Sequence, residues 1–117
     1  MSDRVNNQNA IAGVPTVGTG LSGATTGVKL GYTCPAGRVA VVRYWTVTSI
    51  SGGAPTIVIQ ATIGGVLDVL FSMTASPQVQ QVMIPLNAGD KIEANVTAAI
   101  AATTFSCLFG VEEFLAS

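Results

Sequence analysis

The stretch "TIVIQATIGGVLDVLFSM", residues 56–73, decides the fold class because it has the pattern of a β-hairpin. The runs on either side of Gly64 and Gly65 are rich in β-branched residues and have the period of two that strands show. Two glycines between such runs predict a two-residue turn, since both can adopt positive φ. We expect one face to carry Ile57, Ile59, Ala61, Ile63, Leu67, Val69, Phe71 and Met73.

Period-two alternation recurs on both sides of this hairpin. The run "GVKLGYTC", residues 27–34, is expected to place Val28, Leu30, Tyr32 and Cys34 on one face, and "KIEANVT", residues 91–97, to place Ile92, Ala94 and Val96 together. The longer run 38–50 is apolar on both faces. One face would carry Val39, Val41, Arg43, Trp45 and Val47, and the other Arg38, Ala40, Val42, Tyr44 and Thr46. We expect one to meet the core and the other a neighbouring subunit.

Turn signals separate about seven or eight such strands, including "CPAGR" at 34–38 and "SGGAP" at 51–55. Residues 97–104 are expected to form a loop or strand ends. The pattern predicts an all-β, jelly-roll-like antiparallel β-sandwich over residues 26–117. Residues 1–25 are rich in Gly, Ser, Thr and Asn, so we expect a flexible or extended N-terminal arm. Its "IAGVPTV" portion, residues 11–17, could add one edge strand.

The composition indicates burial between subunits. Of 117 residues only 9% are charged, 49% are hydrophobic, and the mean hydropathy is +0.56. No apolar run approaches the roughly 18 residues of a membrane-spanning helix. An oligomer that hides apolar surface is therefore favoured, with no membrane partner.

Several function classes are disfavoured. A net charge of −1 with scattered basic residues does not suit nucleic-acid binding. The chain has no histidine, which removes the commonest general base and zinc ligand, so we expect no enzyme activity, cofactor, metal or small-molecule substrate. The N-terminus does not resemble a secretory signal, so synthesis in a cytoplasm is expected. Cys34 and Cys107 should then be reduced and buried, with a disulfide between them as the less favoured alternative.

Charge concentrates in "IPLNAGDKIEANVT", residues 84–97, which contains Asp90, Lys91 and Glu93. Asn87 to Asp90 have the side chains of a tight turn, and Lys91 and Glu93 would share the outer face of the next strand. The favoured interpretation is a solvated turn and strand face. An acid/base pair of Asp90 and Glu93, or a calcium site at Asp90, is the alternative.

The remaining acidic residues near the C-terminus are candidates for an ion pair. Glu112 and Glu113 should lie on opposite faces of the last strand because side chains alternate there. Arg43 needs a carboxylate partner if its face is covered, and Glu93, Glu112 and Glu113 are the candidates.

Three stretches, "YTCPAGRVAVVRY", "PLNAGDKIEANV" and "TTFSCLFGVEEF", together resemble the trimeric jelly-roll proteins of the tumour necrosis factor and complement globular-head type. In size, composition and layout the chain looks most like a decoration (cement) protein of a tailed-phage capsid. That resemblance implies a homotrimer on the capsid surface of a virion that binds the major capsid protein and stabilises the assembled head.

We expect the arm to bind the capsid through its charged and amide side chains: Asp3, Arg4, Asn6, Asn7, Gln8 and Asn9. The alternative function is a phage tail or head-fibre domain that binds a host surface or glycan. A secreted-type ligand or lectin-like module is a third, and an enzyme is the least favoured.

Overall fold

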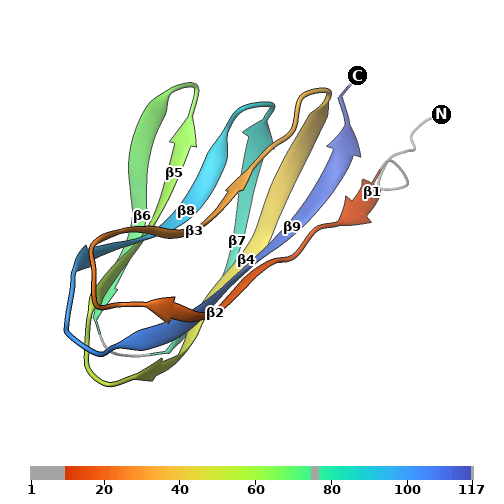
Figure 1. Cartoon of the computed structure of the whole chain (residues 1–117). Coiled ribbons are helices and arrows are strands. Elements are labelled where there is room, and N and C mark those ends of the chain that lie inside the picture. The colour runs from red at the N-terminus through yellow and green to blue at the C-terminus, as the bar shows by residue number, and fades with distance from the viewer. Residues whose placement is uncertain (1–9, 75–76, 117) are drawn as a thin grey trace.

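The structure, a computed structural model, describes residues 10–74 and 77–116 (Figure 1). Within these ranges it contains strands and no helix, and so no helix that could cross a membrane. The nine strands are β1 (Ala10–Gly13), β2 (Thr16–Ser22), β3 (Gly27–Thr33), β4 (Arg38–Ser51), β5 (Thr56–Ile63), β6 (Val66–Thr74), β7 (Gln78–Asn87), β8 (Lys91–Ala98) and β9 (Thr104–Leu115).

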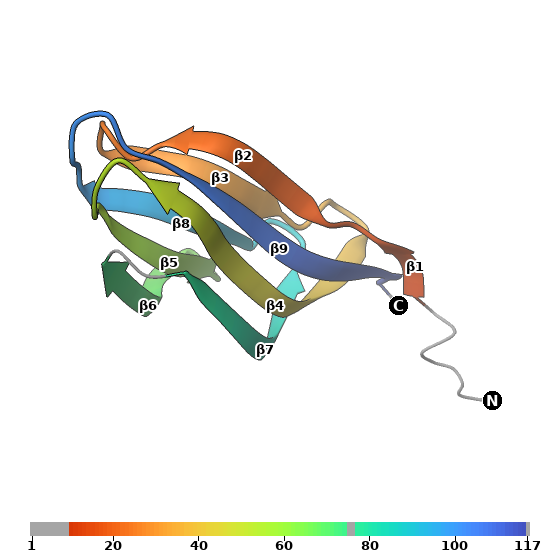
Figure 2. The same ribbon diagram turned by 90° about the horizontal axis from the view of Figure 1, so that it is seen from below.

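The strands form two antiparallel sheets whose order is that of a jelly roll. Sheet A has the order β2-β9-β4-β7, with β1 also paired to β9, and sheet B has the order β3-β8-β5-β6. Strand β5 pairs β6, β4 pairs β7, β3 pairs β8 and β2 pairs β9, so the chain is one long hairpin wrapped into two layers. Figure 2 shows these layers, and the expected all-β sandwich is confirmed.

The centre of the wrapped hairpin is the Gly-Gly turn. Gly64 and Gly65 have φ of 59° and 81°, as the two-residue turn requires. Figure 1 shows the β3–β4, β5–β6 and β7–β8 turns together at one end of the sandwich, beside the C-terminal end of β9. The loop between β8 and β9 lies at the other end, and residues 97–104 form this loop and the strand ends beside it, as expected.

The core fills the space between the sheets. Its largest fully buried side chains include Trp45, Phe105, Phe109, Ile57, Ile59, Leu86 and Ile92. The Trp45 and Phe71 rings pack with centroids 5.3 Å apart. The predicted inward residues of β5 and β8 are buried as expected, except Ile63, which lies at the exposed hairpin tip.

Bulges overturn three of the expected face assignments. In β4 the extra residue Arg43 opposite β9 shifts the alternation, so Ala40 and Val42 share the core face with Trp45 and Val47. In β3 a bulge between Val28 and Leu30 turns Val28 outward. In β6 a bulge at Leu70 places Leu67 and Val69 opposite Thr62 and Gln60 on the outer face of sheet B, where both are more than half exposed. A bulge cannot be read from composition because any residue can occupy it.

Part of the expected N-terminal arm is an edge of the sandwich. Strands β1 and β2 pair with β9, and the Val14 amide donates to the Val111 carbonyl at 2.7 Å. The boundary expected at residue 26 is therefore not a boundary of the structure, because pairing with β9 satisfies the backbone of a segment too polar to pack alone. The predicted capsid-binding residues, Asp3, Arg4, Asn6, Asn7, Gln8 and Asn9, lie outside the described residues.

Both cysteines are free and buried, as the sequence predicted. Burial raises the pKa of the Cys107 thiol to about 12 and also raises the pKa of the Cys34 thiol. Cys34 Sγ lies 3.4 Å from the Arg38 carbonyl oxygen, to which it can donate.

Neither thiol should therefore react with a disulfide reagent in the folded protein at pH 8, because the thiolate is the reactive form and both thiols are shielded. Thiol titration with and without guanidinium tests this. We expect reaction only on unfolding. Fast reaction of either cysteine in the folded protein would contradict the packing described for it.

Candidate functional site

The Asp90 carboxylate connects two turns. It is buried, and it accepts hydrogen bonds from the Gly64 amide at 3.0 Å and the Asn87 amide at 2.9 Å. These two backbone donors hold the pKa of Asp90 below its usual range. The tight turn from Asn87 to Asp90 is confirmed, and Asn87, Ala88 and Gly89 are exposed as expected, but the Asp90 side chain is buried instead of solvated. With one oxygen on each donor, the carboxylate has a structural role.

The backbone of Asp90 is hydrogen-bonded to a third turn, the one between β3 and β4. The Cys34 amide donates to the Asp90 carbonyl at 2.8 Å, and the Gly89 amide donates to the Cys34 carbonyl at 2.9 Å. The β3–β4, β5–β6 and β7–β8 turns are thus joined at one residue. No acid/base pair is formed with Glu93, which has its own partners on the outer face of sheet B.

That outer face carries a row of polar side chains. The side-chain amide of Gln60 donates to the Glu93 carboxylate at 3.1 Å, and the side-chain amide of Asn95 donates to the Gln60 side-chain oxygen at 3.4 Å. Lys91 Nζ lies 3.5 Å from the Glu93 carboxylate. The prediction that Lys91 and Glu93 share one face is confirmed. We call Gln60, Lys91, Glu93 and Asn95 the polar row. Each member contacts another member of the row, so these side chains hold one another along the sheet face.

The two C-terminal glutamates lie on opposite faces of β9, as predicted. Glu113 points into the sandwich, where the Tyr32 hydroxyl donates to it at 2.6 Å and Arg38 Nη1 at 2.7 Å. The Tyr32 hydrogen bond, together with Arg38, lowers the pKa of Glu113. Burial, and next the Glu113 hydrogen bond, raises the pKa of Tyr32 above its ordinary value. This cluster joins β3 of sheet B to β4 and β9 of sheet A.

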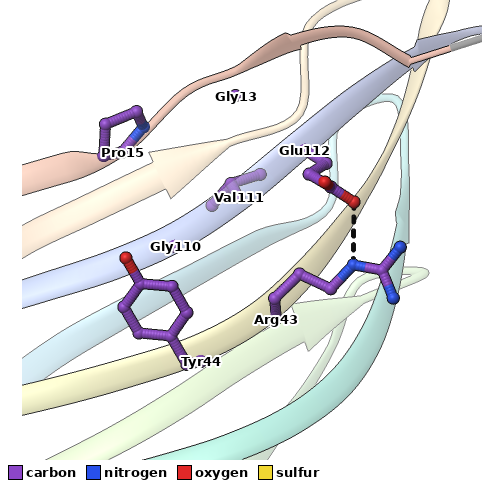
Figure 3. A pocket seen from close by; sticks show the side chains of 7 residues that line it. All are labelled: Gly13, Pro15, Arg43, Tyr44, Gly110, Val111 and Glu112. Carbon is purple, nitrogen blue, oxygen red and sulfur yellow. Dashed lines mark hydrogen bonds and ion pairs between the residues drawn. The ribbon is translucent and has the colours of Figure 1, made fainter.

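Glu112 faces outward and is the partner of Arg43, one of the three partners expected. Arg43 Nε donates to Glu112 Oε1 at 2.8 Å, and both side chains are about 40% exposed. They line a pocket of about 230 Å³ with Gly13, Pro15, Tyr44, Gly110 and Val111 (Figure 3). Tyr44 lies over Gly110, where a Cβ would clash with the ring, so the glycine makes room for the ring.

The pocket is one part of an apolar surface, the outer face of sheet A. The strand registers place Val17 beside Leu108, Leu108 beside Thr46, and Thr46 beside Val79, in one row across four strands. Val17, Val79 and Met83 are 59–67% exposed, and Tyr44 is 36% exposed. One ion pair, Arg43 with Glu112, lies within this surface.

The two outer faces therefore differ in chemistry. Sheet B presents the polar row at its centre and exposed Val28, Leu67 and Val69 on its edge strands, whereas sheet A presents valine, leucine, methionine and tyrosine across its strands with one ion pair. A large exposed apolar surface is typical of an interaction site. Sequence reasoning anticipated a second apolar face on residues 38–50, but the bulge at Arg43 changed which residues belong to it.

Within residues 10–74 and 77–116, no three acidic or cysteine side chains gather closely enough to hold a metal ion. No protein-family model matches this sequence, and a search of the curated proteins returns no match. The outer face of sheet A is thus the candidate functional site, and it is suited to binding another protein surface.

Replacing Glu113 by Gln should lower the free energy of unfolding by about 2 kcal/mol at pH 7, because it removes a carboxylate hydrogen-bonded to Tyr32 and Arg38. Since the pKa of Glu113 is lowered on folding, its contribution is complete above the ordinary carboxyl pKa and is lost as the pH falls through the lowered value. The difference from wild type should therefore shrink in acid.

Urea unfolding between pH 7 and pH 3 measures this effect. Glu112→Gln is the matched control, since its half-exposed ion pair should contribute less than about 1 kcal/mol. If the two variants lost equal stability, or if Glu113→Gln kept the full acid dependence of wild type, the interior cluster would not have the role described.

Proposed function

We propose that this chain is a structural virion protein, a trimeric capsid decoration protein that stabilises the assembled phage head. The observation that carries the proposal is the contrast between the two outer faces of the jelly roll. The face of sheet A is apolar across its strands, as in a protein interface, whereas the face of sheet B is polar at its centre and apolar only on its edge strands.

In this proposal three copies turn the outer face of sheet A toward a common axis. Val17, Tyr44, Val79 and Met83 would be covered there, which accounts for the high apolar content of so small a chain. Cyclic symmetry closes such an assembly without leaving an open apolar surface. The number three comes from the resemblance of the sequence to trimeric jelly rolls.

The trimer would bind the major capsid protein at joints between its subunits. A protein that binds the assembled shell and not its separate subunits stabilises the shell by mass action. Three copies held together gain avidity from contacts that are individually weak. Residues Asp3, Arg4, Asn6, Asn7, Gln8 and Asn9 remain the proposed contact of each copy with the capsid.

The decisive experiment locates the protein on a particle. Quantitative mass spectrometry of purified virions should give a capsid-like copy number, and add-back of the protein to heads lacking it should raise their resistance to heat. A tail-like copy number, with binding to a host surface or glycan, would instead support the tail or head-fibre alternative. Absence of the protein from virions would overturn the proposal.

Replacing Val79 by Glu should dissociate the trimer, because it places a charge within the covered face. Val28→Glu is the matched control, since Val28 is 49% exposed on the outer face of sheet B. Sedimentation equilibrium should give a trimer for wild type and Val28→Glu and a smaller species for Val79→Glu. The reverse pattern would show that sheet B forms the interface.

A further inference from the structure

The edge strands of the two sheets differ in how they are protected against pairing with another chain. A free edge has unpaired amides and carbonyls, and proline, glycine or lysine usually discourages pairing there. Pro15 precedes β2, which contains Gly18 and Gly20; β3 contains Lys29 and two glycines; β7 contains Pro85. Strand β6, which pairs only with β5, contains none of these residues; of the other features that discourage pairing it has one bulge, at Leu70, and one charge, Asp68.

The first half of β6 exposes apolar side chains on both faces, whereas Met73 further along the strand is buried. Val66, Leu67, Val69 and Leu70 are each 41–67% exposed and together form an exposed apolar patch. Figure 1 shows β6 at the outer edge of sheet B, next to the β5–β6 turn. A chain added alongside β6 would gain main-chain hydrogen bonds and would cover these side chains, which is how β-augmentation works.

The charge of Asp68 indicates which kind of residue an added chain would carry opposite it. It is the one charged residue of β6, it is exposed, and it has no hydrogen bond or ion pair among the described residues. If two copies paired antiparallel about the centre of the exposed stretch, the two Asp68 carboxylates would lie opposite each other, which is unfavourable. A segment with lysine or arginine at that position would form a favourable cross-strand pair.

We propose that the free edge of β6 binds an extended, apolar segment of the shell protein, with a basic residue opposite Asp68. The shell protein as the source rests on the proposed function, whereas the strand pairing rests on β6 itself. Sheet B would become five-stranded on attachment, and the polar row would stay solvated.

A blocked peptide as long as β6 tests the pairing, with alternating threonine and valine and lysine at the centre. Matched peptides carry glutamate at the centre, or lysine with N-methylated amides on alternate residues. Fluorescence anisotropy should show the lysine peptide binding about fivefold more tightly than the glutamate peptide. The preference should reverse in Asp68→Lys, and the N-methylated peptide should not bind. Hydrogen exchange of the β6 amides should slow when the lysine peptide is added.

Three results would overturn the proposal: no binding of the lysine peptide at millimolar concentration, equal affinity of the two charged peptides, or β6 protection that rises with protein concentration alone. The last would show that a second copy occupies the edge. Sedimentation of the Asp68→Lys variant separates the β6 proposal from the trimer proposal, because this variant should still be a trimer. A wild-type monomer would end the trimer proposal and leave the peptide test intact.

Discussion

The Asp90 carboxylate, with amides of two different turns as its donors, is the constraint on which the end of this sandwich depends. A jelly roll made from one wrapped hairpin brings turns together that are distant in sequence. Gly64 and Asp90 are 26 residues apart, yet they share a hydrogen bond of 3.0 Å. With Cys34 bound to the Asp90 backbone, the three turns hold a fixed relation to one another. The most charged stretch of the sequence thus serves the fold.

Polar groups elsewhere are also paired with other groups of the same molecule. Glu113 connects the two sheets through Tyr32 and Arg38, and the polar row connects neighbouring strands within sheet B. In a chain with few charges, most of those in the described residues are therefore satisfied inside the molecule. Asp68 stands apart from this pattern, and so does the apolar outer face of sheet A.

These two exceptions lie on different parts of the molecule. The outer face of sheet A is broad and suits packing against a similar subunit, whereas β6 is a strand edge and suits main-chain pairing with an extended segment. Self-association and attachment to a larger shell would then use separate surfaces. If the chain acts as proposed, the contact between copies would not compete with the contact to the shell.

The sequence by itself determined the all-β class, the Gly64-Gly65 turn, the turn at Asn87–Asp90, the buried reduced cysteines and the opposite orientation of Glu112 and Glu113. These follow from local rules: period-two alternation, the positive φ that glycine tolerates, and the side chains of tight turns. The candidate face was foreseen only as a second apolar side of residues 38–50.

Tertiary structure decided the rest. Bulges at Arg43, at Leu70 and between Val28 and Leu30 reversed the expected side-chain directions. Pairing with β9 placed β1 and β2, within residues 10–22, in the sheet. Turns that are distant in sequence enclosed Asp90. Each depends on which strands become neighbours, and local alternation carries no information about that.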